Sequence, residues 1–168
     1  EIFAAAKKMV EAEMLNDKIL VVVAPGLAPS ASSGPAKSES QPWPEGVMGL
    51  VAGRLCEEYS RPALVISKFK NEIKGSGRSL DEFNIIQAVE RLSEHLARFG
   101  GHAAACGLTL KSGADLEAFT KKIKIIALKE LAGIELAPKI LIEAEIDLAE
   151  INDELIETLD KFEPFGEE

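Results

Sequence analysis

The chain has 168 residues, of which 46% are hydrophobic and 28% charged, and its formal net charge is −9. This composition is typical of a globular domain that buries one hydrophobic core. No apolar run approaches the ~18 residues of a membrane span and no signal-peptide pattern is present, so we expect a cytoplasmic protein without membrane contact.

The first part of the chain is predicted to form a helix, a strand and a second helix around a flexible insertion. Residues 1–15 place apolar side chains at helical spacing, and residues 19–23 (ILVVV) are a continuous apolar run of the kind found in buried strands. Residues 24–42 are rich in Pro, Ser, Ala and Gly, so we expect them to be flexible. Residues 46–59 have helical periodicity, with three glycines spaced for the close approach of another backbone.

The middle of the chain is predicted to alternate between strands and one long helix. Residues 63–67 (ALVIS) form a second apolar strand. The sequence GSGRS at residues 75–79 is typical of a strand or a tight turn with exposed backbone. We expect Asp81 to cap a helix that runs to about Arg98, and residues 103–110 to form another strand.

The last third is predicted to contain two amphipathic helices. The first begins after Ser112 or Asp115, and the second covers residues 148–162; between them, residues 140–146 alternate as a strand with one exposed face. Because strands alternate with helices, we predict an α/β fold, a single layered domain with a mixed β-sheet flanked by helices. The predicted segments are a leading helix and first strand (1–23), the insertion (24–42), the domain core (43–147) and a C-terminal helix that begins a linker (148–168).

The charge is unevenly distributed along the chain. Residues 108–168 carry seven Lys and fifteen Asp or Glu, whereas residues 61–79 carry five Lys or Arg and a single Glu. The overall acidity therefore does not exclude a polyanionic partner, because the contact would be local. A solvated basic loop fits this charge equally well.

Several classes of active site are not predicted. The two His and the scattered acids form no DxD, HExxH or Asp-His-His pattern, so we predict no metal site. Cys106 and His102 are four residues apart, which on a strand is roughly 13 Å, too far for a nucleophile and its base. We expect Cys56 and Cys106 to be buried thiols in a reducing compartment. The chain is not expected to contain a complete active site.

Two glycine-rich segments could bind phosphate. GSGRS has the composition of a backbone nest, with Arg78 and two serine hydroxyls as further donors; GGH at 100–102 offers backbone N–H groups and the His102 imidazole. Each also fits an ordinary turn or a structural histidine, but together, on neighbouring strands, they favour a nucleotide or polynucleotide backbone. The predicted substrate-binding residues are Lys74, Gly75, Ser76, Gly77, Arg78, Ser79, Gly100 and Gly101.

The order of five segments resembles one enzyme family. WPEGVMGLVAGRL, RPALVIS, GSGRS, FGGHAAACGLTL and FEPFG, between Trp43 and Gly166, are similar to the C-terminal part of RecJ-type exonucleases. These enzymes are single-strand-specific 5′→3′ DNA exonucleases of the DHH phosphoesterase superfamily, used in DNA repair and recombination. The resembling part is the DHH-associated domain, whose hallmark is Gly-Gly-His followed by small residues.

The resemblance implies roles for individual residues. His102 would face the catalytic cleft and help to position the scissile phosphate, and Arg78, Ser76 and Ser79 would line the channel for single-stranded DNA. The Mn²⁺ or Mg²⁺ of the family belongs to a DHH domain that precedes these segments, and an oligonucleotide-binding barrel follows them. Since the chain begins with Glu1 rather than Met, we expect it to be a piece of a longer protein. Because the resemblance puts the metal ligands in the DHH domain, which this piece lacks, we expect it to bind no metal and not to hydrolyse DNA alone.

The sequence departs from the family in two places and leaves two other functions open. Trp43-Pro44 stands where the family commonly has Trp-His, and the insertion at 24–42 is longer than the usual loop. Related domains also occur in oligoribonucleases and cyclic-dinucleotide phosphodiesterases, so a substrate domain of such an enzyme is the alternative. A third possibility is a protein-interaction module that uses the acidic region 143–168.

Overall fold

The chain folds around one mixed β-sheet. The structure is a computed structural model that describes residues 1–27, 42–138, 142 and 144–164, and it divides into two compact units, Glu1–Pro138 and Lys139–Glu168. The five strands of the first unit are β1 (Leu20–Val23), β2 (Ala63–Phe69), β3 (Glu72–Arg78), β4 (Leu96–His102) and β5 (Ala105–Leu110). Their order is β1-β2-β3-β5-β4; β1 and β2 are parallel and all other neighbours antiparallel. The predicted α/β fold with a mixed sheet is confirmed.

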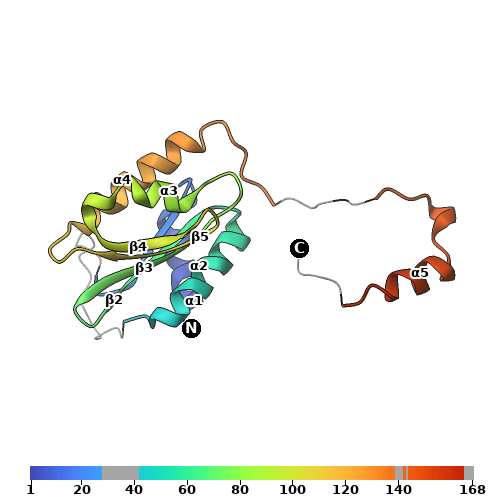
Figure 1. Cartoon of the computed structure of the whole chain (residues 1–168), viewed down its shortest axis with the longest axis horizontal. Helices are drawn as coiled ribbons and strands as arrows, with labels where there is room; N and C mark the ends of the chain where they lie inside the picture. Colours follow the sequence, from blue (N-terminus) through green and yellow to red (C-terminus); the bar gives the residue numbers. More distant parts are fainter. Residues whose placement is uncertain (28–41, 139–141, 143, 165–168) are drawn as a thin grey trace. The chain divides into compact units, whose positions relative to one another are not determined.

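Helices cover both faces of this sheet (Figure 1). On one face lie α1 (Ile2–Glu13) and α2 (Glu45–Tyr59), and on the other α3 (Ile85–Glu90) and α4 (Leu116–Glu130). The strand residues alternate between two hydrophobic clusters, because Leu20, Val22, Ala63 and Val65 pack with α1 and α2, whereas Val21, Leu64 and Ile66 pack with α3 and α4. Both faces of β1 and β2 are therefore buried, which is why these strands are continuous apolar runs in the sequence.

The α1/α2 side covers the sheet unevenly. Helix α2 packs against β2 and β3, while Gly100 and His102 of β4 and Gly107 of β5 remain exposed. Beyond α2, the sheet therefore presents an open surface on β5 and β4. We call this surface, together with the residues of β3 that border it on the same side of the sheet, the open face.

The helix predicted from Asp81 to Arg98 is much shorter in the structure and begins after a different cap. The structure has a helix of six residues, α3, capped by Asn84, whose side chain accepts a hydrogen bond from the Gln87 N–H. The chain enters β4 at Leu96, which is buried opposite Leu110 of β5. Pairing with β5 and burial of Leu96 stabilise a strand where the local apolar spacing favours a helix, which is the usual way tertiary contacts override propensity.

The other predicted elements of the first unit form close to their expected positions. Helix α4 begins after Asp115, whose carboxylate accepts a hydrogen bond from the Ala118 N–H, as in a standard N-cap. The first 23 residues are part of the compact unit, because β1 pairs in parallel with β2. Most of the predicted insertion, residues 28–41, lies outside the described residues. No helix that the structure describes combines the length and apolarity needed to cross a membrane.

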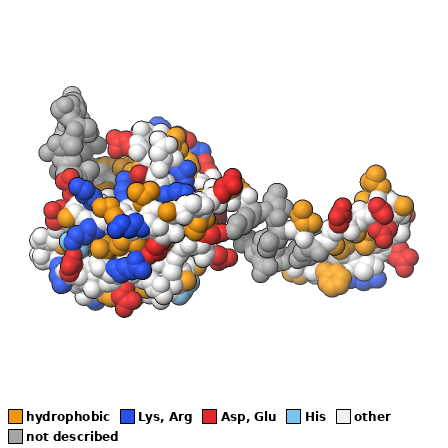
Figure 2. Space-filling view, turned by 90° about the horizontal axis from the view of Figure 1, so that it is seen from above, with side chains coloured by type: hydrophobic (Ala, Val, Ile, Leu, Met, Phe, Trp, Pro, Cys, Tyr) orange, Lys and Arg blue, Asp and Glu red, His pale blue; other side chains and the backbone are white. Residues whose placement is uncertain are grey.

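The second unit is small and differs from its prediction. Residues 139–141 and 143 lie outside the described residues, and Ile142 and residues 144–147 form no strand where one was expected over 140–146. The predicted helix at 148–162 is shorter: a 3-10 turn, η2 (Leu148–Glu150), precedes α5 (Asp153–Asp160). Acidic and hydrophobic side chains lie interspersed on its surface (Figure 2).

Candidate functional site

Arg78 and His102 lie in one row across the sheet. Arg78 at the end of β3 is opposite Ala105 of β5, and Ala105 is opposite His102 of β4. Residues directly opposite each other in antiparallel strands lie on the same face. With strands ~4.8 Å apart, the Cα atoms of Arg78 and His102 are separated by roughly 10 Å, and we call these three residues the first row.

The first row belongs to the open face. A Cβ built on Gly49 of α2 would lie 3.3 Å from Nη2 of Arg78 and 3.3 Å from Oγ of Ser76, so both side chains point toward α2. Two residues back along β3, Ser76 is opposite Gly107, which is opposite Gly100; these form the second row. Apart from the adjacent residues of the chain, no atom of the described residues lies within 4 Å of a Cβ added to Gly100 or Gly107. The second row is therefore a floor almost without side chains.

The two glycine-rich segments do not occupy neighbouring strands. We expected GSGRS and GGH to be adjacent, but β5 lies between β3 and β4. The register nevertheless aligns them, because Gly77 is opposite Cys106 and Cys106 is opposite Gly101. The two segments therefore do not pair with each other directly. The register still places Ser76 and Arg78 on the same face of the sheet as Gly100 and His102.

GSGRS lies mostly in strand β3, one of the two forms expected of it, and does not form the backbone nest that its composition allowed. β3 is the central strand, and Gly75 and Gly77 pair with β2 on one side and β5 on the other, so their peptide groups lie within the sheet. Both glycines are buried. A Cβ on Gly77 would lie 2.6 Å from Cδ1 of Ile85 and 2.8 Å from Sγ of Cys106. These glycines make room for the α3 side of the core.

The two glycines before His102 have different structural reasons. Gly101 has a φ of +146°, and its added Cβ would lie 2.2 Å from the carbonyl oxygen of Ala105. It therefore permits the close approach of the β5 backbone, in a conformation that other residues rarely adopt. Gly100 is exposed and has free space above it, so its missing side chain keeps the open face flat.

Arg78 is held in place by neutral groups. Its guanidinium donates a hydrogen bond from Nη1 to the carbonyl oxygen of Gly77 at 3.0 Å. Its Cγ would lie 3.9 Å from a Cβ on Gly53. The small size of Gly49 and Gly53 thus makes room for the Arg78 side chain, whereas we expected it to make room for another backbone. Arg78 takes part in none of the ion pairs formed among the described residues. Its charge is thus available to a ligand.

Ser79 and Lys74 have local partners. The Ser79 hydroxyl donates to the Phe83 carbonyl oxygen at 2.6 Å, and the Ser79 N–H donates to the Ala104 carbonyl oxygen at 2.8 Å. The first bond closes the loop after β3, and the second ties this loop to the tip of the β4–β5 hairpin. Lys74 pairs with Glu45 at 2.8 Å and with Glu72 at 3.7 Å.

Sequence reasoning missed Arg98 and Thr109. Lys74 is opposite Thr109, and Thr109 is opposite Arg98. These three residues form a third row and line a cleft of about 290 Å³ beside the N-terminal end of α2. Arg98 could be recognised only from the hairpin register, because the sequence placed it at the end of a predicted helix.

The described residues include no metal site and no nucleophile paired with His102. No group of three or more His, Cys, Asp and Glu side chains lies together in the parts of the chain that the structure describes. Burial raises the pKa of the Cys56 and Cys106 thiols to about 11. Cys106 packs in the α3/α4 cluster, on the face opposite the first row. Both cysteines are buried and free, as predicted.

Comparison with known families gives one extensive match. The family model of the DHHA1 domain matches residues 16–128. The single-stranded-DNA-specific exonuclease RecJ of Bacillus subtilis (strain 168) is 30% identical over 163 residues, which cover 96% of this chain and 19% of that protein. RecJ of Salmonella typhimurium is 29% identical over 130 residues, or 74% of this chain and 22% of that protein. The chain thus spans about a fifth of the length of these relatives.

Solved structures share the fold. The crystal structure of exonuclease RecJ bound to manganese matches with a TM-score of 0.56 and 24% identity, covering 79% of this chain and 30% of that one. RecJ from Thermus thermophilus in complex with Mg²⁺ matches with a TM-score of 0.51 and 24% identity, covering 76% of this chain and 18% of that one. The described residues of this chain supply no ligand set that fits such a metal.

Proposed function

This chain belongs to the DHHA1 domain family, and from that premise we propose that it is the single-strand-binding domain of a RecJ-like 5′→3′ exonuclease of the cytoplasm that acts in DNA repair and recombination. Its ligand is the phosphate backbone of single-stranded DNA. Its catalytic partner is a DHH domain of the same full-length protein, which supplies the Mn²⁺ or Mg²⁺. This chain alone is expected to bind DNA without hydrolysing it.

The observation that carries the proposal is the first row. It brings together a guanidinium without an acidic partner among the described residues, a small residue and an exposed imidazole on one open surface. Arg can grip a phosphate with two parallel N–H donors, and an imidazole can donate a third hydrogen bond. The glycine floor of the second row lets a strand lie close to the sheet.

The roles of the residues follow from their positions. Arg78 would anchor a phosphate beside α2, where its side chain is already held by Gly49, Gly53 and the Gly77 carbonyl. His102 lies at the end of the edge strand β4, where it would orient a neighbouring phosphate toward the catalytic domain. Such positioning lowers the barrier by holding the reacting groups in place, and requires no proton transfer by His102.

The test is fluorescence anisotropy of this chain with a labelled, 5′-phosphorylated single strand. Phosphate contacts release counterions, so Arg78→Ala should weaken binding and reduce the slope of log K against log salt by about 1. The loss should be similar for oligo-dT and oligo-dA, because phosphate contacts read no bases. His102→Ala should also weaken binding.

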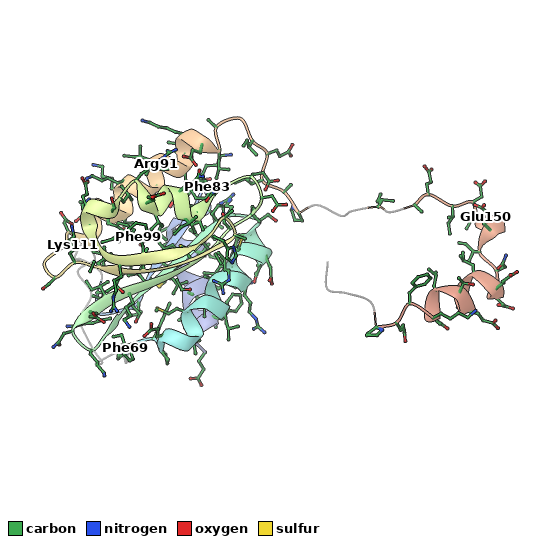
Figure 3. All side chains as sticks on the ribbon, in the orientation of Figure 1. Phe69, Phe83, Arg91, Phe99, Lys111 and Glu150 are labelled. Atoms are coloured by element: carbon green, nitrogen blue, oxygen red, sulfur yellow. The ribbon has the colours of Figure 1, made fainter. Side chains whose placement is uncertain are left out.

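A matched control is available on the opposite face. Arg91 follows α3 and is exposed, so Arg91→Ala removes the same charge away from the open face (Figure 3). Arg91→Ala should leave affinity and salt slope close to wild type. Equal effects of the two substitutions, or equal affinity for duplex and single strand, would contradict the proposal.

A further inference from the structure

The third row lies on the same face as the first, four residues further along β3. At ~3.4 Å per residue, the Cα atoms of Lys74 and Arg78 are roughly 13–14 Å apart. Between them lies the glycine floor of the second row, where the side chains are small or missing. The open face therefore carries cationic side chains at two separate places along the strands.

The cleft at the third row has the donors that a phosphate needs. Arg98 is 73% exposed at its side chain and borders the cleft, and Thr109, opposite it, is buried at the cleft floor. Lys74 is mostly covered and is held over the ring of Phe69, 5.0 Å from its centroid. The guanidinium, the hydroxyl and the ammonium approach the cleft from three neighbouring strands.

Two carboxylates form ion pairs with these cations in the structure. Glu72 lies 3.4 Å from Arg98 and 3.7 Å from Lys74, and Glu45 lies 2.8 Å from Lys74. Glu72 and Glu45 are about half exposed. Arg98 and Glu72 are exposed, and exposed ion pairs contribute only about 0–1 kcal/mol, so a phosphodiester of the strand can take the place of Glu72 beside Arg98 and Lys74.

We propose that Lys74, Thr109 and Arg98 form a second phosphate subsite, and that Glu72 competes with the phosphate for it. The inference rests on the proposed function and extends it to a strand that contacts the domain at two phosphates. A single strand long enough to cover both rows engages both subsites. A dinucleotide reaches only one, so the second subsite makes binding depend on strand length.

The experiment compares a 5′-phosphorylated 12-residue oligo-dT, followed by anisotropy, with the 5′-phosphorylated dinucleotide of dT, measured as its competitor. Arg98→Ala should weaken binding of the 12-mer by roughly threefold to tenfold, as expected for one partly solvated charge-assisted contact, and leave the dinucleotide unchanged. Arg78→Ala should weaken both ligands. Arg91→Ala is the charge-matched control for both.

The competing carboxylate gives a result of the opposite sign. Glu72→Gln should strengthen binding of the 12-mer and leave the dinucleotide unchanged. Glu90→Gln removes the same charge from an exposed position on α3, on the other face of the sheet. It should change the affinity for the 12-mer by less than Glu72→Gln does.

The outcomes separate the two proposals. If Arg78→Ala weakens the 12-mer and Arg98→Ala does not, or if Arg98→Ala weakens the dinucleotide equally, the second subsite is wrong and the proposed function stands. If neither substitution affects binding, the proposed function is wrong as well. Because Arg98 is exposed, circular dichroism of Arg98→Ala should match wild type, and a changed spectrum would count against a role confined to binding.

Discussion

The two adjacent glycines of the GGH segment should differ in how much stability they lose when replaced by alanine. Gly101→Ala is expected to destabilise the first unit strongly, whereas Gly100→Ala is not. The Cβ added at Gly101 would lie 2.2 Å from the Ala105 carbonyl oxygen and 2.7 Å from Cα of Cys106, both backbone atoms, and the φ of Gly101 is +146°. At Gly100, apart from the adjacent residues of the chain, no atom of the described residues lies within 4 Å of the added Cβ.

The magnitude follows from two costs at Gly101. A non-glycine residue in a sparsely populated backbone region costs about 1–3 kcal/mol. Forcing an extra methyl group into occupied space costs about 1–3 kcal/mol more. β4 is an edge strand and can shift to relieve part of the clash, so we expect a loss of about 2–4 kcal/mol in the free energy of unfolding. Gly100→Ala should change it by less than about 1 kcal/mol, because it mainly restricts the unfolded chain.

The assay is urea unfolding followed by far-UV circular dichroism and by the fluorescence of Trp43, which is buried. The slope of free energy against urea should be unchanged, so that a shift of the midpoint reports stability alone. If Gly101→Ala and Gly100→Ala unfold at the same urea concentration, the argument from the β5 backbone contact is refuted. Gly100→Ala should in addition weaken DNA binding, since it places a methyl group on the open face.

Two further predictions concern the core. Gly77→Ala places a Cβ 2.6 Å from Cδ1 of Ile85 and should lower the free energy of unfolding by about 1–3 kcal/mol. The loss should exceed that of Gly75→Ala, whose added Cβ has Cδ1 of Leu108 as its closest neighbour, at 3.0 Å. Adding Ile85→Val should restore part of the stability that Gly77→Ala loses in urea unfolding, and losses that simply add up would contradict the contact. Burial raises the pKa of the Cys56 and Cys106 thiols to about 11, above the ~8.5 of an unfolded cysteine, so the free energy of unfolding should fall as the pH rises from about 9 to 11. Urea unfolding across this range should show a smaller fall in a variant with both cysteines replaced by Ala, and an identical pH dependence would contradict the role of the thiols.

Local chemistry made several elements predictable. The apolar runs of β1 and β2 reflect burial on both faces, and the carboxylate of Asp115 caps α4 as its position before an amphipathic run suggests. Gly-Gly-His next to small residues indicated a close approach of another backbone, and Gly101 does lie against the Ala105 carbonyl oxygen. These features depend on neighbours within a few residues, so the sequence contains them directly.

The candidate binding surface depends on strand pairing that cannot be read from the sequence alone. The segment after Asn84 has the apolar spacing of a helix, and only pairing of Leu96 with Leu110 turns its end into β4. The same hairpin inserts β5 between the two glycine-rich segments and brings Arg98 into line with Lys74.

The amino-acid sequence by itself determined which residues carry hydrogen-bond donors, charges or no side chain, because these are properties of single residues. Tertiary structure decided which of them share a surface. It placed Gly75 and Gly77 inside the sheet and left Gly100, His102 and Arg98 exposed on its open face. Strand register sets that division, because moving a strand by one residue turns every side chain to the opposite face.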